Sequence, residues 1–347
     1  MSLWVHEFRP SNFAELDLNE RLTDNLRQLC TEEELPHLLL YGPPGSGKQT
    51  RVGACLQELF GAGSRRIKIE SRQLDAGGSK KLEITMVSSV YHVEITPSEA
   101  GNQDRFVVQE LLKEIAQTQQ IDQNAKHRYK VVVINEADHL TREAQAALRR
   151  TMEIYTSNLR IVMVATSLSP IMEPIRSRTL LVRVPAPSED EIAKVLQSIA
   201  AAKRVSVQSD AVLHKIAATS QRNMRKAILM LEAMYAQNEQ LTESAVVPLA
   251  DWEAVIKKEA FEIVKSPTTS KLAEVRGTNY ELLSHCIPPQ IILRTLLLQI
   301  LPLVDAKAAP GIIEAAALFD HRIRLGTKAI FHLEAFVARV MNVLSSR

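Results

Sequence analysis

Residues 37–50 have the sequence HLLLYGPPGSGKQT, which joins an apolar run to a glycine-rich segment that ends in a lysine. The apolar run at 37–41 predicts a short buried strand, and small and apolar residues at helical spacing over 48–60 predict a helix. Strand, glycine-rich loop and helix together form one α/β unit. Three of the chain's 12 glycines lie between Gly42 and Gly47, and this concentration in a glycine-poor chain indicates a loop.

Strands and helices continue to alternate up to residue 184. The strands are expected at 67–70, 82–95, 130–134, 160–165 and 179–184, and the helices between them at 104–119 and 141–155. This alternation predicts a parallel sheet with helices on both faces. The sequence therefore indicates an α/β domain over residues 1–185.

After residue 185 the pattern is helical and no strand is predicted. Ser188 and Glu191 form a capping-box pattern that opens a helix, and about three helices are expected over 188–236. The polar stretch 238–251 is a plausible linker to a second helical block. The predicted domains are an α/β domain (1–185), a small helical domain (186–246) and a larger helical domain (247–347).

Composition excludes several classes of protein. The 347 residues suit two or three domains, and 46% hydrophobic with 24% charged residues is typical of globular proteins. The net charge of +2 gives no bulk basicity that would indicate nucleic acid, and three widely spaced cysteines exclude a disulfide framework. The apolar stretch 287–304 is interrupted by prolines and Arg294, so it predicts a buried helix and no membrane partner.

Residues 42–48, GPPGSGK, match the phosphate-loop pattern through its lysine. The backbone N–H groups of such a loop cradle phosphate oxygens, and the following helix presents its positive N-terminal end. Lys48 is expected to reach the β- and γ-phosphates. A tight turn without a ligand is the alternative, and the strand–loop–helix context disfavours it. The candidate nucleotide-binding residues are Gly42, Gly45, Ser46, Gly47, Lys48, Gln49 and Thr50.

The residue after the lysine departs from the pattern. A Ser or Thr is required there to coordinate Mg²⁺, but this sequence has Gln49, with Thr50 one place later. A shift of one residue on a helix rotates the hydroxyl by about 100°. The backbone cradle therefore favours nucleotide binding, whereas Mg²⁺ placement is left unassigned.

Residues 131–138, VVVINEAD, resemble a Walker B element. The first acid of that element normally holds Mg²⁺ and the second polarises the attacking water. Asn135 replaces the first acid, and Glu136 keeps the catalytic-base position. A neutral amide lacks the charge that a hard dication needs. Gln49 and Asn135 affect the same ion, so we expect a site that binds ATP or ADP, hydrolyses it poorly or not at all, and holds no assigned metal.

These motifs give the chain a family resemblance. The chain resembles the clamp-loader ATPases of the AAA+ class, and closely the small subunits of eukaryotic replication factor C. The matching segments are WVHEFRP (4–10), ALRRTME (147–153), IRSRT (175–179) and NMRKA (223–227). Thr166 stands at the sensor-1 position, where the family usually has Asn. Segments 280–289 and 321–336 resemble the one small subunit whose own site is degenerate and which closes the ring.

The resemblance implies an AAA+ domain, a helical lid and an all-helical collar. It also implies a heteropentamer, active in replication and repair in the nucleus, that uses ATP to open a sliding clamp and place it on primer–template DNA. Arg178 would then be an arginine finger acting in trans on a neighbour's ATP, and Glu136 would be silent in its own site. Arg9 and Arg225 would contact nucleotide, although Arg225 could equally be an exposed helix arginine.

Arg105 is the DNA-contact candidate from the same resemblance, with a solvated charge at a helix start as the alternative. A phosphate contact there would carry no sequence information. Two other functions stay open. An active AAA+ ATPase, such as a remodeller or branch-migration motor, is disfavoured by Gln49 and Asn135. A scaffold that binds no nucleotide is disfavoured by the intact cradle. The ATPase activity is expected of the complex rather than of this subunit alone.

Overall fold

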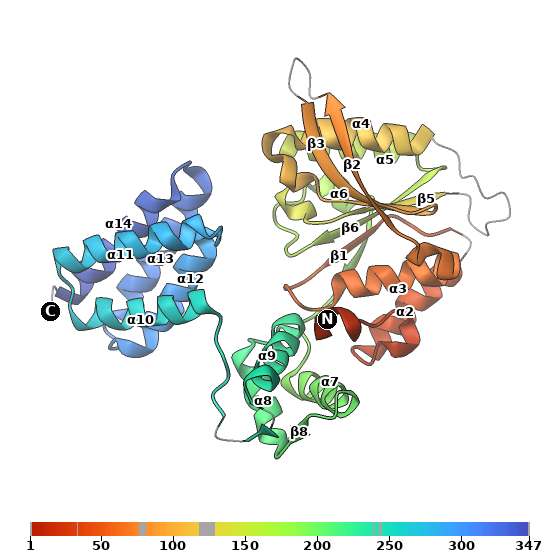
Figure 1. Ribbon diagram of the computed structural model, residues 1–347. Helices are drawn as coiled ribbons and strands as arrows, with labels where there is room; N and C mark the ends of the chain where they lie inside the picture. The colour runs from red at the N-terminus through yellow and green to blue at the C-terminus, as the bar shows by residue number, and fades with distance from the viewer. Residues whose placement is uncertain are drawn as a thin grey trace. The chain divides into compact units, whose positions relative to one another are not determined.

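The computed structural model describes residues 2–32, 34–75, 81–117, 129–238, 240–242 and 245–345. The chain divides into two compact units, Met1–Val247 and Pro248–Arg347. The first unit contains a sheet and a small group of helices, and the second contains a helical bundle (Figure 1).

In the described part of the first unit, seven strands form one sheet in the order β2-β3-β4-β5-β6-β1-β7. The strands are β1 (Leu38–Tyr41), β2 (Lys68–Asp75), β3 (Lys81–Ser88), β4 (His92–Ile95), β5 (Lys130–Ile134), β6 (Leu159–Ala165) and β7 (Leu180–Arg183). From β4 to β7 all neighbours are parallel, whereas β2–β3 and β3–β4 are antiparallel. The predicted parallel sheet is thus confirmed around the phosphate loop and is extended into a mixed sheet at one edge.

The prediction of one continuous strand over 82–95 is wrong. A turn separates β3 from β4, in which the Ser89 N–H donates to the His92 carbonyl over 2.8 Å. The Ser89 hydroxyl accepts a further bond from the His92 N–H at 2.9 Å. This turn contains neither glycine nor proline, which are the usual sequence signals for a turn. In the sequence, Gly77 and Gly78 predict a turn between the strands expected at 67–70 and 82–95, and these two residues lie outside the described ones.

Helices cover both faces of the sheet. They are α2 (Glu20–Thr31), α3 (Lys48–Phe60), α4 (Asp104–Gln117), α5 (Arg142–Ile154) and α6 (Glu173–Arg176), with 3₁₀ turns η1 (Phe13–Glu15), η2 (Gly61–Arg65), η3 (Pro97–Gln103) and η4 (Ala137–His139). The short helix α1 (Trp4–Glu7) packs instead on the helices that follow the sheet. On β5, Val132 and Ile134 join the core beneath α4 and α5, while Val131 and Val133 join the core beneath α2 and α3. Alternate residues of a strand face opposite sides, so a strand covered on both sides is apolar throughout.

Three further helices complete the first unit. They are α7 (Glu189–Ala202), α8 (Asp210–Thr219) and α9 (Met224–Gln237). The predicted capping box is confirmed, because the Glu191 N–H donates to the Ser188 hydroxyl at 3.2 Å and the Ser188 N–H donates to the Glu191 carboxylate at 2.6 Å. Two short strands, β8 (Ser206–Val207) and β9 (Gln240–Leu241), pair in parallel here. They correct the expectation that no strand follows residue 185.

The second unit is helical throughout its described residues. Its helices are α10 (Asp251–Lys265), α11 (Thr269–Ser284), α12 (Pro289–Ile300), α13 (Ala309–Leu325) and α14 (Ala329–Ser345), with the 3₁₀ turn η5 (Leu301–Leu303). Their apolar faces share one core that includes Ile292 and Phe336, both fully buried. The stretch 287–304 supplies α12, which is buried along one face, while Ile291 and Leu298 are exposed, so the prediction of a buried helix holds for that face alone. Among the helices that the structure describes, none has the length and apolar character to cross a bilayer.

Candidate nucleotide site and interface arginine

The phosphate loop lies between β1 and α3, as the sequence predicts. Gly42 follows the last residue of β1, and α3 begins at Lys48. A Cβ atom on Gly42 would lie 2.0 Å from the carbonyl oxygen of Val184, so only glycine lets the two chain segments approach this closely. The loop thus places successive backbone groups at the N-terminus of α3, where an anion is stabilised.

Two polar side chains of the loop fit a phosphate ligand. The Ser46 residue is 3% exposed, and its buried hydroxyl has no hydrogen-bond partner among the described residues. The Lys48 ammonium donates to the Gly42 and Pro43 carbonyls at 2.7 and 2.8 Å, so it lies across the loop. A bound phosphate would give both groups a charged partner.

Two other charges lie near the lysine. Burial lowers the pKa of Lys48, the carboxylate of Asp138 opposes this shift, and the Arg225 guanidinium adds to it. Arg225 is exposed on the first turn of α9. The structure therefore brings Lys48, Asp138 and Arg225 together. This arrangement suits an anionic ligand that lies between the phosphate loop and the lid, the group of helices α7, α8 and α9. Asp138 is a site residue that the sequence left without a role.

The position after the lysine does not fit a metal ligand. The Gln49 side chain hydrogen-bonds to Glu94 of β4, and burial raises the pKa of that carboxyl, while Arg9 and Gln49 oppose the shift. The amide of Gln49 is thus engaged by a protein group. Among the described residues no three His, Cys, Asp or Glu side chains form a metal-binding group. Gln49 therefore offers no free side chain to Mg²⁺, and Thr50 lies half-buried one position further along α3.

Glu94 is a second site residue that sequence reasoning missed. It lies within a strand, and its local sequence carries no motif. The influence of Arg9 on its pKa shows that this arginine is near the same place, although Arg9 itself is exposed. Glu94, Gln49 and Arg9 therefore form a polar group beside the phosphate loop.

The end of β5 presents the Walker B side chains. Glu136 has φ of 52° and ψ of 41°, a left-handed conformation that is uncommon for a non-glycine residue. Its carboxylate accepts a hydrogen bond from the Ser98 hydroxyl at 2.9 Å and lies 3.5 Å from His139 Nδ1. Glu136 is thus held by its own chain in this state.

The sensor-1 position is tied to the same loop. The backbone N–H of Thr166 donates to the Asp138 carboxylate at 3.1 Å, and the Thr166 hydroxyl donates to the same oxygen. Asp138 is buried, so these bonds offset the cost of desolvating its charge. The ends of β5 and β6 are therefore joined through Asp138.

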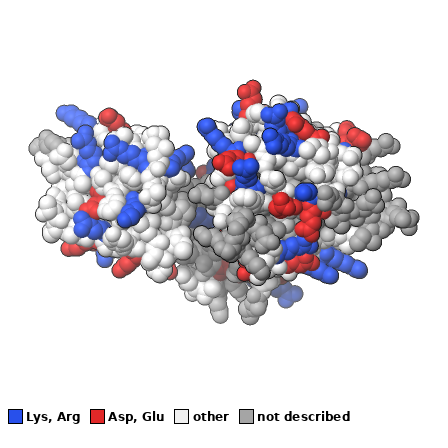
Figure 2. All heavy atoms as spheres, turned by 90° about the horizontal axis from the view of Figure 1, so that it is seen from above, with Lys and Arg blue, Asp and Glu red and all other residues white. Residues whose placement is uncertain are grey.

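Arg178 and Arg105 lie apart from this group of contacts. Arg178 follows α6 and contacts residues of α5 and α6, and its side chain is 37% exposed. Arg105, on the first turn of α4, forms an exposed ion pair with Glu143 of α5 at 3.0 Å. On the face seen in Figure 2, basic and acidic side chains are interspersed.

The N-terminal segment packs on the lid helices. Trp4 is 7% exposed in the core of α7, α8 and α9, and its ring centroid is 5.4 Å from that of Tyr235. Its backbone N–H donates to Glu232 at 3.2 Å. Trp4 thus packs the N-terminal segment onto these helices.

Comparison with known proteins agrees with this architecture. Three family models match: "DNA polymerase III, delta subunit" over 18–188, "RCF1/5-like, AAA+ ATPase lid domain" over 194–236, and "Replication factor C subunit 3, C-terminal domain" over 252–347. A variant of RuvB from Thermotoga maritima has a similar structure, with a TM-score of 0.52 and 17% identity over 80% of this chain and 88% of that one. At that identity the likeness shows the fold alone.

The mixed sheet, the phosphate loop after β1 and the helical lid define an AAA+ protein. Replication factor C subunit 5 of Neurospora crassa is 52% identical over 344 residues, covering 99% of this chain and 97% of the relative. The chain therefore belongs to the replication factor C subunit 3/5 family. Subunit 5 of Saccharomyces cerevisiae is 49% identical (98% and 99% covered), and human subunit 3 is 45% identical (98% and 96% covered).

Proposed function

We propose that this chain is a subunit of an ATP-driven clamp loader that places a sliding clamp on primer–template DNA in replication and repair. The observation that carries the proposal is similarity to replication factor C subunits along 99% of the chain. The partners are the other subunits of a heteropentamer, the clamp and primer–template DNA, and the compartment is the nucleus. The proposed domain limits are 1–185, 186–246 and 247–347.

Reconstitution tests this proposal. The remaining replication factor C subunits, without this chain, should fail to load the clamp onto primed circular DNA, and adding the chain should restore loading. A chain that neither co-purifies with those subunits nor changes loading would exclude the proposal. A fluorescent fusion outside the nucleus would exclude the proposed compartment.

The chain's own site is proposed to bind ATP or ADP without hydrolysing it. The glycine loop between β1 and α3, and the Ser46 hydroxyl, which has no hydrogen-bond partner among the described residues, support binding. The engagement of Gln49 by Glu94, with Asn135 in place of an acid, supports the lack of hydrolysis, because metal assistance contributes several kcal/mol to such reactions. Glu136 keeps the base position without a metal-bound nucleotide to act on.

The two alternatives give different results with purified chain. A non-hydrolysing site should release nucleotide on denaturation and show no turnover with Mg²⁺. Turnover that Lys48→Ala abolishes would indicate an active ATPase of the remodeller or motor type. No bound nucleotide and no binding by calorimetry would indicate a scaffold.

Arg178 is proposed to act on the ATP of a neighbouring subunit, from the position that closes the pentamer. Its contacts lie on α5 and α6 and not on its own phosphate loop, which supports a role in trans. A guanidinium at the γ-phosphate is worth about 10³–10⁵ in rate in related chemistry. Arg178→Ala should therefore lower the ATPase activity of the complex by the contribution of the neighbouring subunit's site, and it should leave assembly intact.

Arg105, Arg9 and Arg225 complete the proposed contacts. Arg105 is assigned to DNA phosphate, and Arg9 and Arg225 to nucleotide. In this structure Arg105 is paired with Glu143. Because Arg105→Ala removes one proposed phosphate contact, the variant should weaken DNA binding by the complex and make its salt dependence shallower. An unchanged salt dependence would leave Arg105 as a surface ion pair.

A further inference from the structure

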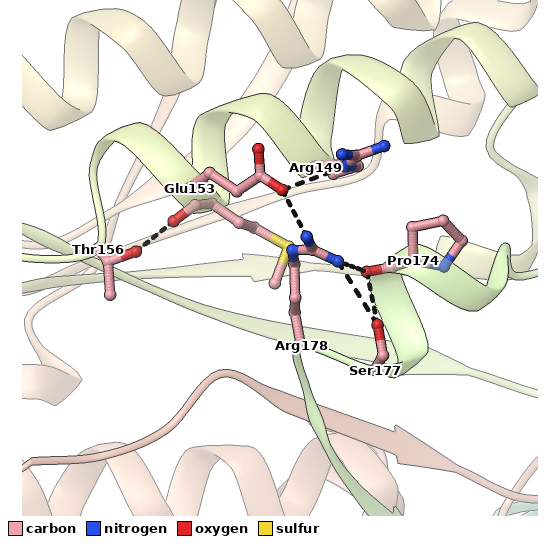
Figure 3. A network of polar contacts seen from close by, with 7 residues as sticks. Arg149, Glu153, Thr156, Pro174, Ser177 and Arg178 are labelled. Carbon is pink, nitrogen blue, oxygen red and sulfur yellow. Dashed lines mark hydrogen bonds and ion pairs between the residues drawn. The ribbon is translucent and has the colours of Figure 1, made fainter.

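Arg178 is held against its own subunit by two sets of contacts (Figure 3). One terminal nitrogen, Nη2, lies 2.7 Å from Oε1 of Glu153 on α5. The other, Nη1, donates to the Pro174 carbonyl at 2.9 Å and lies 3.5 Å from the Ser177 hydroxyl. Pro174 is four residues earlier in the chain, so the arginine side chain folds back over the preceding helix α6.

Glu153 is shared between two arginines. The Nε of Arg149, one turn earlier on α5, donates to the same Oε1 atom at 3.1 Å. The hydrogen bond and charge of Arg149, together with Arg178, lower the pKa of Glu153, so the carboxylate is ionised near neutral pH. Two positive charges thus compete for one negative charge, and the cluster as a whole is positive.

We propose that Glu153 is a positioning residue that restrains Arg178 on its own subunit, and that Arg149 retains Glu153 when Arg178 turns to a phosphate on a neighbour. This inference rests on the proposed role of Arg178 as a finger. The Arg178 and Glu153 side chains are 37% and 41% exposed, so their attraction is weak and reversible. A terminal phosphate offers a guanidinium a stronger, bidentate partner.

The second arginine lowers the cost of release. When Arg178 moves away from Glu153, the carboxylate loses one of its two ion pairs. It keeps the other, because Arg149 remains bonded to the same oxygen. Removing Glu153 and removing Arg149 should therefore act in opposite directions. Glu153→Gln frees the finger, whereas Arg149→Ala leaves the carboxylate to Arg178 alone and strengthens the restraint.

The test uses the complete complex reconstituted with full-length subunits, without DNA, and measures kcat and KM for ATP. Glu153→Gln should raise the finger-dependent kcat by about two- to fivefold, the range expected for losing an exposed ion pair. Arg149→Ala should lower kcat by a similar factor. The double variant should match Glu153→Gln, because Arg149 acts through Glu153. If Glu153 served only the fold, Glu153→Gln and the double variant would both have a lower kcat than wild type.

The matched control is Glu58→Gln, which removes an exposed carboxylate from the Arg27–Glu58 pair at 3.9 Å and should leave kcat unchanged. Thermal unfolding checks that every variant folds. An unchanged or lower kcat in Glu153→Gln overturns the restraint, and so does a loss of kcat that persists in the double variant. In either case Arg178→Ala still tests separately whether Arg178 is a finger. If Arg178→Ala itself leaves kcat unchanged, the finger is refuted and the restraint with it.

Discussion

The side-chain oxygen of Asn223 lies 1.8 Å from the position that a Cβ atom on Gly45 would occupy. Asn223 caps α9, accepting a bond from the Lys226 N–H at 3.1 Å, and the next residue, Met224, donates its N–H to the Gly45 carbonyl at 3.3 Å. The last lid helix therefore rests directly on the phosphate loop. The missing side chain at position 45 makes this contact possible.

Gly45→Ala should accordingly separate the lid from the loop. The new Cβ would collide with Asn223, and φ at this position is +72°, where an L-residue costs on the order of 1–3 kcal/mol. We expect at least about tenfold weaker ADP or ATP binding, measured by calorimetry. Gly53→Ala is the control, because nothing lies within 4 Å of its Cβ position on α3. If both variants bind alike, the lid contact does not matter for the nucleotide.

Nucleotide affinity should be almost independent of Mg²⁺. Since Gln49 is hydrogen-bonded to Glu94 and Asn135 carries no charge, EDTA should change the Kd for ADP by less than about twofold. The double variant Gln49→Thr with Asn135→Asp supplies a hydroxyl and a carboxylate, and its affinity should gain Mg²⁺ dependence. Strong weakening of the wild-type affinity by EDTA would contradict the assignment.

The local sequence predicts the phosphate-loop unit well. The helix at 48–60 begins and ends where expected, because the glycine loop and an apolar periodicity define it within a few residues. The strand predicted at 82–95 fails since its turn is closed by the hydroxyl of Ser89, whose effect depends on reaching His92. Side-chain hydrogen bonds of this kind leave a weaker signal than glycine or proline.

The missed site residues share a different cause. Glu94 is a strand residue that reaches Gln49, and Asp138 is bonded by Thr166, 28 residues later. Their roles depend on which strands become neighbours, since β4, β5 and β6 lie side by side. A sequence motif is made of residues that are close in sequence, so it identifies Lys48 and Glu136. It does not identify Glu94 and Asp138, whose hydrogen-bond partners come from other parts of the chain.

The second unit should lose stability as pH rises through neutrality. Glu259 on α10 is 5% exposed, and both carboxyl oxygens lack a partner among the described residues. Burial, with the nearby Glu262 charge and against that of Lys271, raises the pKa of Glu259 from 4.5 to about 8. In the unfolded chain the proton leaves near pH 4.5, while the folded chain keeps it. Unfolding therefore becomes easier between these values, by about 1.4 kcal/mol per pH unit for this group.

Glu259→Gln removes that titration. Relative to wild type, the variant should gain stability steadily from pH 5 to pH 8, measured by urea unfolding and by hydrogen exchange of the α10 amides. A constant offset from the buried amide is expected and does not alter the slope. Glu314→Gln, at an exposed position of α13, should keep the wild-type slope. Equal slopes for wild type and Glu259→Gln would show that Glu259 ionises normally.

An ion pair between Glu7 and Lys203 joins the N-terminal segment to the lid. Lys203, which ends α7, lies 2.6 and 2.7 Å from the two Glu7 oxygens, and its ammonium is 5.3 Å from the Phe8 ring centroid. Glu7→Lys sets two ammonium groups against each other, so it should destabilise the first unit by about 1 kcal/mol, more than Glu7→Gln does. Combining it with Lys203→Glu should recover most of that loss in a double-mutant cycle of urea unfolding. If the double variant is no more stable than Glu7→Lys alone, the pair does not hold the segment on the lid.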